Sequence, residues 1–308
     1  MHYGVDLGGT KLLFTAYDTD WQPCERQQLP TPANDYDALL TLLAQLVNDA
    51  DTRFGQRGSL GLGFPGIVTE AGRVVAANLP AIHGRLLTQD LTERLTRPVV
   101  VDNDANCFLW SELHGGAADG ASCAFGVTIG TGIGGAICCR GALHRGANGV
   151  AGEIGHVPLP VTLLLKYPDL PMLRCGCGRL ACSETLASGS GLTRLYQHLG
   201  GERLSGEQIV ARYQDKEPRA QACIDRWLEV LAAMLAAAIS TFDPHVVVLG
   251  GGLARFEPLY HELPRRLPGH LLPGVTLPAI LGARYGADAG VRGAALLTLA
   301  MNGKDSLS

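Results

Sequence analysis

The sequence predicts an α/β fold built from two related halves. Apolar segments of strand length alternate with longer segments of helical periodicity, and this alternation is typical of α/β domains. Three of the predicted strands lead directly into glycine-rich turns. Residues 4–10 (GVDLGGT) also resemble residues 126–132 (GVTIGTG), so we expect one strand–turn–strand unit to occur twice.

The predicted elements follow from these patterns in chain order. Residues 2–7 and 12–17 are apolar and form a hairpin around the first glycine-rich turn. A helix at 36–50 carries its apolar residues on one face. The remaining elements are strands at 60–64, 98–101, 123–129 and 136–139, a helix that begins at Ser205 with a capping box to Gln208, a helix at 220–242 that ends before Pro244, and a strand at 246–249.

Length and composition favour a globular protein of two domains. The chain has 308 residues, more than a single core usually organises. Hydrophobic residues make up 46% and charged residues 18%, as in ordinary folded proteins. Glycines cluster near 117–121, so we place the first domain at 1–118 and the second at 119–289. A C-terminal helix at about 290–302 should pack back on the first domain.

Charge and hydropathy make a nucleic-acid or membrane partner unexpected. The net charge is −4, so no overall basic field attracts nucleic acid or anionic lipid. The longest apolar stretch, near 228–239, is interrupted by Glu229 and is too short to cross a bilayer. No signal peptide is visible, and an odd number of cysteines, nine, indicates thiols or metal ligands rather than disulfides. We therefore expect a cytoplasmic protein.

Three glycine-rich turns are candidates for holding phosphate groups. They are Gly8 and Gly9 followed by Thr10 and Lys11, the segment from Gly130 to Gly135, and Gly250 to Gly252. Backbone N–H groups in such turns form concave anion sites, and Lys11 adds a cation. One such turn could simply connect two strands, but three of them favour a nucleotide site. A dinucleotide fingerprint is excluded because residues 136–139 form a strand where that motif needs a helix, and the Walker A spacing is absent.

A polar cluster follows the predicted strand at 98–101. Asp102, Asn103, Asp104 and Asn106 stand where a buried strand ends and a helix should begin. Aspartate and asparagine are common helix N-caps, which is the alternative interpretation of each of them. A carboxylate held rigidly at this position can also orient and deprotonate an attacking hydroxyl, as a kinase requires.

Three cysteines and a histidine predict a metal site. Cys175, Cys177 and Cys182 lie within eight residues, and His156 lies upstream. Three thiolates and one imidazole form a closed tetrahedral zinc site without a position for water, so the zinc would be structural. The alternative is a group of buried cysteines, which the close, glycine-separated spacing disfavours.

Together these motifs resemble the ROK family of bacterial sugar kinases and repressors over essentially the whole chain. The segments 6–11 (DLGGTK) and 130–135 (GTGIGG) resemble the family's two phosphate loops. The segment 152–156 (GEIGH) and the cysteine segment that ends at Cys182 and Glu184 resemble its zinc and sugar signature. The resemblance implies a two-domain, actin-like ATPase fold (hexokinase-like, ribonuclease H-like) with an interdomain cleft. It also implies a kinase that uses ATP, Mg²⁺ and a structural Zn²⁺ to phosphorylate a sugar.

The resemblance also implies roles for individual residues. Asp104 would be the base that accepts the proton of the sugar 6-hydroxyl, and Asp6 would help to position magnesium. The sugar-binding residues would be Gly66, Asn78, Asn103, Asp104, Glu153, His156 and Glu184. The ATP-binding residues would be Gly4, Val5, Asp6, Leu7, Gly8, Gly9, Thr10, Lys11, Gly130, Thr131, Gly132, Ile133, Gly134, Gly135, Gly250, Gly251 and Gly252. The zinc ligands would be His156, Cys175, Cys177 and Cys182.

The sugar substrate is the open question within the family. Four segments resemble members that phosphorylate N-acetylglucosamine, namely residues 77–80, 102–107, 195–198 and 268–273. Three residues near the last zinc cysteine depart from the usual family pattern, namely Ala181, Ser183 and Thr185. The alternatives are a fructokinase, which the segment 146–153 also resembles, and a glucokinase.

A sugar-responsive repressor of the same family is a more distant alternative. Such repressors carry a helix-turn-helix domain before the first strand, whereas here that strand begins at residue 2. A zinc-ribbon interaction module would leave the glycine-rich turns unexplained. We expect a homodimer. We also expect zinc to orient the sugar-binding loop through His156, while ATP binding, on glycine turns elsewhere in the sequence, depends on the metal less.

Overall fold

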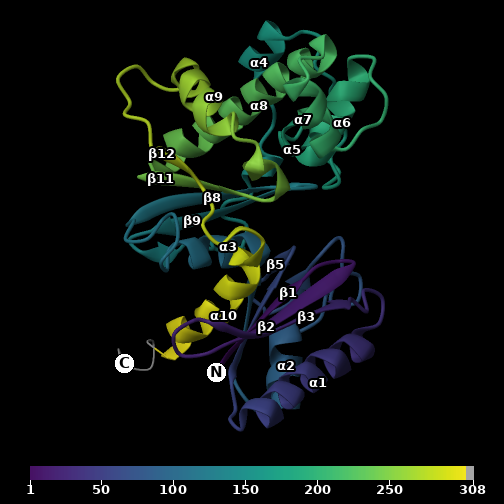
Figure 1. The fold of residues 1–308 in the computed structure, drawn as a ribbon, viewed down its shortest axis with the longest axis vertical. Helices are drawn as coiled ribbons and strands as arrows, with labels where there is room; N and C mark the ends of the chain where they lie inside the picture. The colour runs from purple at the N-terminus through teal and green to yellow at the C-terminus, as the bar shows by residue number, and fades with distance from the viewer. Residues whose placement is uncertain (303–308) are drawn as a thin grey trace. The chain divides into compact units, whose positions relative to one another are not determined.

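The computed structural model describes residues 1–302, which form two compact units (Figure 1). The first unit contains Met1–Asp119, Leu143–Ala151 and the described residues from Ala287 onward. The second unit contains Gly120–Ala142 and Gly152–Gly286. The segment Leu143–Ala151 differs from the sequence prediction, which placed it in the second domain. Its Arg145 pairs with a buried aspartate of the first unit, which explains the difference.

A five-stranded sheet forms the centre of the first unit, with the strand order β3-β2-β1-β4-β7. Its strands are β1 (His2–Leu7), β2 (Lys11–Tyr17), β3 (Pro23–Pro30), β4 (Ser59–Phe64) and β7 (Val99–Asn103). β1 is antiparallel to β2 and parallel to β4, and β4 is parallel to β7. The sequence patterns predicted four of these strands and missed β3, a polar edge strand whose residues alternate between exposed and half-buried.

Four α-helices of the described chain belong to the first unit: α1 (Tyr36–Phe54), α2 (Leu87–Leu95), α3 (Asp104–Glu112) and α10 (Ala289–Asn302). α10, yellow in Figure 1, packs against α3, β1 and β4. Glycines permit this approach. A Cβ atom on Gly61 of β4 would lie 1.7 Å from the carbonyl oxygen of Ala294, and one on Gly293 would lie 1.7 Å from that of Cys107. These backbone contacts fix the last helix of the chain to the first unit.

The second unit repeats the plan of the first. Its sheet has the order β10-β9-β8-β11-β12. The strands are β8 (Cys123–Ile129), β9 (Ile133–Cys139), β10 (Ala142–Leu143), β11 (Val246–Gly250) and β12 (Ala279–Gly282). Again a central strand, β8, is antiparallel to the next strand of the chain and parallel to a later one, β11. The shared strand order confirms the predicted duplication, and the strand β9 confirms that the second turn is not a dinucleotide-binding motif.

Helices cover the sheet of the second unit. The longest is α8 (Pro218–Phe242), which is buried over most of its length and ends at Asp243 with φ of 43°, before Pro244. The others are α4 (Val161–Lys166), α5 (Glu184–Ala187), α6 (Gly189–His198), α7 (Gly206–Gln214) and α9 (Leu259–Arg266). The predicted capping box of Ser205 and Gln208 is present at the start of α7. Within residues 1–302, none of the helices combines the length and apolar character that crossing a bilayer requires.

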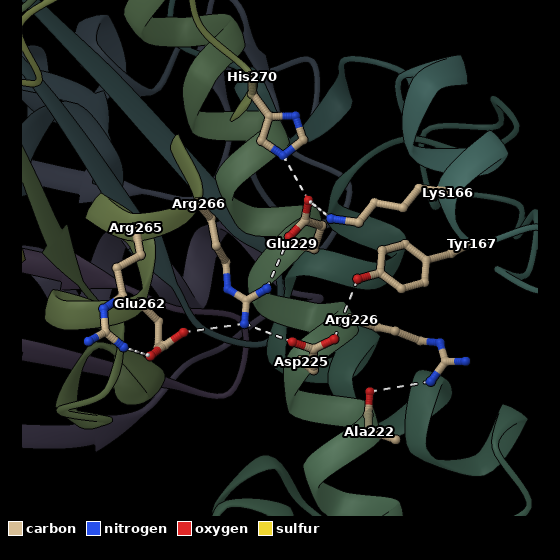
Figure 2. A network of polar contacts seen from close by, with 10 residues as sticks. All are labelled: Lys166, Tyr167, Ala222, Asp225, Arg226, Glu229, Glu262, Arg265, Arg266 and His270. Atoms are coloured by element: carbon tan, nitrogen blue, oxygen red, sulfur yellow. Dashed lines mark hydrogen bonds and ion pairs between the residues drawn. The ribbon is translucent and has the colours of Figure 1, made fainter. Parts of the chain in front are cut away.

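A buried carboxylate anchors several helices of the second unit (Figure 2). Glu229 of α8 accepts hydrogen bonds from Lys166 at 2.7 Å, Arg266 at 3.0 Å and His270 at 3.1 Å. Burial raises the pKa of Glu229, but the contacts with Lys166 and Arg266 outweigh it, so the pKa lies below its usual value. One buried charge therefore ties α4, α9 and the segment after α9 to α8. His270, from a segment that resembles N-acetylglucosamine kinases, thus contributes to packing in this unit.

Candidate active site

The corner between β7 and α3 carries the polar cluster of the first unit. Asn103 is the N-cap of α3, and its Oδ1 accepts the backbone N–H groups of Ala105 at 2.8 Å and Asn106 at 3.3 Å. Its Nδ2 donates to the carbonyl oxygen of Gly66 at 2.8 Å. The capping interpretation therefore holds for Asn103. The same side chain also joins two positions, 66 and 103, that the family resemblance assigns to sugar binding.

Asp104 and Asp6 are two carboxylates of this unit with raised pKa values. Desolvation raises the pKa of Asp104, opposed by the N–H of Ala105, which donates to its carboxylate at 2.8 Å. Burial, and then the charge of Asp104, raise the pKa of Asp6 to about 6 against the opposing charge of Lys11. A carboxylate with a raised pKa holds a proton more firmly, which suits a general base that works near neutral pH.

The first glycine-rich turn joins β1 to β2 in the same unit. The N–H of Gly8 donates to the carbonyl oxygen of Lys11 at 3.0 Å, and the hydroxyl of Thr31 donates to that of Gly8 at 2.8 Å. A Cβ atom on Gly9 would lie 2.9 Å from the carbonyl oxygen of Asn78, so glycine permits this approach. The first unit therefore gathers predicted site residues from four separate segments, namely 6–11, 66, 78 and 103–104.

Asp102 and Arg145 form an ion pair that sequence reasoning missed. Asp102 Oδ2 accepts from Arg145 Nε at 2.7 Å and Nη2 at 2.6 Å. Its Oδ1 accepts the N–H of Asn103 and the side-chain amide of Asn106, both at 2.8 Å. Asp102 is only 5% exposed, and these four bonds compensate for its burial. The ion pair and residues from the loop 146–149 line a cavity of about 450 Å³ in the first unit.

The second and third glycine-rich turns lie together in the second unit. The second turn is closed by a hydrogen bond of 3.0 Å from the N–H of Gly130 to the carbonyl oxygen of Gly132. The third turn contains Gly251, whose φ is 83°. A Cβ atom there would lie 2.5 Å from the carbonyl oxygen of Ile129, which directly precedes the second turn. Both turns thus follow the ends of neighbouring parallel strands, β8 and β11, where α/β sheets commonly bind ligands.

The four predicted metal ligands come together in the second unit. One ligand atom each of His156, Cys175, Cys177 and Cys182 lies within 4.8 Å of all the others. The Sγ atoms of Cys177 and Cys182 are 3.6 Å apart, as are Cys175 Sγ and His156 Nδ1. Zinc bonds of about 2.0–2.3 Å place tetrahedral ligands roughly 3.3–3.8 Å apart, so the cluster fits zinc. The backbone N–H of Arg179 is the main cause that lowers the pKa of Cys177 to about 6, which favours its thiolate.

The residues that depart from the family pattern are accommodated around this cluster. Ala181 has φ of 57°, in the left-handed region that favours glycine, which is the residue that the family resemblance leads us to expect here. The hydroxyl of Ser183 donates to the carbonyl oxygen of Val157 at 2.9 Å, and that of Thr185 donates to Cys182 at 2.7 Å. The departures therefore leave the four ligands in place, at the cost of one strained backbone position.

Two carboxylates flank His156. Glu153 Oε2 lies 3.7 Å from His156 Nε2, and Glu184 Oε1 lies 3.7 Å from His156 Nδ1. All three side chains are partly exposed. The second unit therefore groups the three residues that the resemblance assigns to sugar hydroxyls beside the candidate metal ligands.

Two sheets with one strand order, each opening with an antiparallel hairpin whose turn is rich in glycine, define an actin-like, hexokinase-like ATPase fold. The sequence profile of the ROK family matches residues 2–301. The chain belongs to the ROK family.

Relatives of known name and structure agree with this assignment over nearly the whole chain. An N-acetyl-D-glucosamine kinase of Pectobacterium atrosepticum is 44% identical over 304 residues, which cover 98% of this chain and 100% of the relative. One of Yersinia pseudotuberculosis is 43% identical, with 97% and 99% covered. The structure of a ROK hexokinase from Thermus thermophilus matches with a TM-score of 0.85 at 33% identity, covering 99% of each chain. A ROK family glucokinase from Streptomyces griseus, in complex with glucose and AMPPNP, matches with a TM-score of 0.78 at 29% identity, covering 96% and 98%.

Proposed function

We propose that the protein is an ATP-dependent kinase of the 6-hydroxyl of N-acetyl-D-glucosamine, giving N-acetyl-D-glucosamine 6-phosphate and ADP. The family and the names of relatives more than 40% identical over nearly the whole chain support this. The observation that carries the proposal is the corner at Asp104. There a carboxylate of raised pKa follows the capping residue Asn103 and belongs to the same unit as the first glycine-rich turn.

Asp104 is the general base in this mechanism. The sugar O6 attacks the γ-phosphorus of ATP while the O6–H proton passes to Asp104. The bond from the γ-phosphorus to the bridging oxygen of ADP breaks, and ADP leaves with the electron pair. Asn103, fixed by its cap and by its bond to Gly66, orients the sugar beside the base. Because Asp104 must be ionised to accept the proton, activity should rise with pH through its raised pKa.

The remaining sugar contacts are side chains with polar hydrogen-bonding groups. The family resemblance assigns sugar hydroxyls to Gly66, Asn78, Asn103, Glu153, His156 and Glu184. Carboxylates accept hydrogen bonds, the amides of asparagine donate and accept them, and an imidazole with one nitrogen on a metal donates with the other. This set of groups matches hydroxyls, each of which both donates and accepts.

The glycine-rich turns bind the phosphates of ATP through backbone N–H groups, and Lys11 adds positive charge. Gly250 to Gly252 approach the adenosine. Asp6 suits Mg²⁺, because a carboxylate oxygen beside phosphates is a usual ligand for that ion, directly or through water. When bound, Mg²⁺ neutralises charge that develops on the transferred phosphoryl group.

The cluster of His156 and three cysteines holds a structural zinc ion. His156, Cys175, Cys177 and Cys182 would together fill the four positions of a tetrahedral zinc ion, so its role would be structural rather than chemical. Elemental analysis should find about one zinc per chain. Protein that is fully active and contains no zinc would remove the metal from this account.

A fructokinase or a glucokinase is the second candidate, because the segment 146–153 also resembles fructokinases. An assay that couples ADP release to a colour change, run with N-acetylglucosamine, glucose, N-acetylmannosamine and fructose side by side, separates them. We expect the highest kcat/KM with N-acetylglucosamine. A clear preference for fructose or glucose would overturn the proposed substrate.

We further propose that the protein acts as a cytoplasmic homodimer without nucleic-acid or membrane partners. The net charge of −4 gives no attraction to polyanions. Light scattering of the purified protein should give twice the chain mass of 32.5 kDa. A mass of one chain at working concentration would contradict the dimer.

A further inference from the structure

The second glycine-rich turn packs directly against the segment that carries His156. A Cβ atom on Gly135 would lie 2.1 Å from the carbonyl oxygen of Gly152, and one on Gly155 would lie 3.0 Å from the side chain of Ile133. Larger residues at these positions would force the backbones apart. The turn and the segment 152–156 therefore form one closely packed block within the second unit.

Glu184 joins this turn to the metal cluster. Its Oε2 accepts the backbone N–H of Ile133 at 3.3 Å, and a Cβ atom on Gly132 would lie 3.1 Å from the same oxygen. Its Oε1 lies 3.0 Å from Sγ of Cys175 and 3.7 Å from Nδ1 of His156. Oε2 of Glu184 thus contacts the second glycine-rich turn, and Oε1 contacts the metal cluster.

We propose that Glu184 is a positioning residue that ties the metal cluster to the second glycine-rich turn, so that metal loading strengthens the binding of nucleotide phosphates. Glu184 follows Cys182 by two residues and begins α5, so a metal held by Cys182 fixes the backbone from which the carboxylate extends. A metal-bound Cys175 is a thiolate and no longer donates to Oε1, so the restraint acts through this backbone. The restrained carboxylate keeps the N–H of Ile133 and its turn in one conformation.

Donors that are already ordered bind a phosphate at a lower entropic cost than donors that must first be ordered. The inference rests on the proposed function, because it takes the second turn to bind the nucleotide. It also replaces the expectation from sequence that ATP binding depends little on the metal. That expectation treated the turns as remote from the metal site, whereas the second turn contacts Glu184 and the segment 152–156 in the fold.

Calorimetric titration with Mg·ADP in the absence of sugar tests the proposal, because it measures nucleotide affinity without turnover. Glu184→Ala removes the carboxylate and leaves all four metal ligands in place. Glu184→Gln keeps an oxygen that can accept from Ile133. Glu202→Ala, at a carboxylate whose side chain is 64% exposed in the same unit, is the matched control. We expect Kd for Mg·ADP to rise about five- to tenfold in Glu184→Ala, and to stay within about twofold of the parent in Glu184→Gln and Glu202→Ala.

Zinc removal gives an independent arm. Chelation, or the substitution Cys177→Ser, should raise Kd for Mg·ADP by a similar factor, with zinc content measured on the same sample. If Cys177→Ser does not fold, Glu184→Ala with full zinc content and an unchanged Tm decides the question. Parental affinity in that variant would overturn the coupling while leaving the proposed function intact. Failure of the parent itself to bind Mg·ADP would overturn the proposed function and the coupling together.

Discussion

The first and second glycine-rich turns hold equivalent places in two sheets of the same strand order, yet their surroundings differ. The first turn belongs to the unit that contains Asp6 and Asp104, whose pKa values are raised. The second turn packs against Glu184 and the segment 152–156, beside the metal cluster. The duplicated framework thus carries two carboxylates of raised pKa in one unit and a carboxylate beside the candidate metal ligands in the other. Shared topology fixes where a ligand-binding turn lies, and the side chains around it decide its role.

Asp104→Asn removes the proposed base of the first unit and should give the largest effect. The amide keeps the size of the carboxylate and can accept the N–H of Ala105, but it cannot take the proton of the sugar hydroxyl. We expect kcat to fall by ~10²–10⁴-fold, with sugar binding and zinc content little changed. Steady-state assays and calorimetry measure these quantities. Asp37→Asn, at an exposed position of α1, is the control. Near-parental turnover would make Asp104 a structural residue.

Asp6→Asn tests whether the ionised carboxylate of Asp6 in the first unit lowers the stability of the fold. The pKa of Asp6 is raised from 3.8 to about 6, so the folded state binds this proton more tightly than the unfolded state. Ionisation of Asp6 therefore costs stability progressively as pH rises from about 4 through about 6, and the full cost remains above that range. The shift corresponds to at most ~3 kcal/mol.

We expect Asp6→Asn to unfold in urea at higher concentration than the parent at pH 8. The gain in free energy of unfolding should shrink to roughly half at pH 5, where folded Asp6 is largely protonated. An equal gain at both pH values would show that the charge of Asp6 is not its source.

Arg145→Met tests the ion pair that braces the corner of the first unit. The substitution leaves the buried carboxylate of Asp102 without its cation. Because the Arg145 side chain is 48% exposed, we expect a discounted loss of about 1–2 kcal/mol in the free energy of unfolding. We also expect a several-fold fall in kcat with little change in KM for ATP.

Arg145→Lys retains a positive charge and should restore most of the kcat. Arg26→Met, which removes an exposed ion pair with Asp288, is the matched control and should change stability by less than about 1 kcal/mol. Equal effects of Arg145→Met and Arg26→Met would remove Arg145 from the catalytic corner.

Ala181→Gly tests the strained backbone position beside the candidate metal cluster of the second unit, and it should give the smallest effect. Glycine adopts the φ of 57° without the strain that alanine bears. The free energy of unfolding should therefore rise by about 1 kcal/mol, and Tm with it, while zinc content stays unchanged. Ala211→Gly, at an exposed position in α7, should instead lower Tm, because glycine weakens a helix. A lower Tm for Ala181→Gly would indicate that the methyl group contributes packing that outweighs the strain.

Local sequence signals predicted the central strands, the glycine-rich turns and the three cysteines of the candidate metal cluster, because each depends on residues close together in the chain. The strand β3 and the helix α2 were missed, since PCERQQLP and LTQDLTERL are polar and short. The ion pair of Asp102 and Arg145 and the bond from Ile133 to Glu184 join residues 43 and 51 positions apart. No spacing rule predicts such pairs, because only the folded backbone brings them together.

The central claim is that this chain uses ATP to phosphorylate the 6-hydroxyl of N-acetyl-D-glucosamine with Asp104 as base. Phosphorus and proton NMR of a reaction of the purified protein with Mg·ATP and N-acetylglucosamine tests it most directly. We predict one new phosphomonoester signal, coupled to the two protons on carbon 6, that grows in step with ADP and grows at least ~10²-fold more slowly with Asp104→Asn. Phosphate on another oxygen, or ADP formed without a sugar phosphate, would contradict the account.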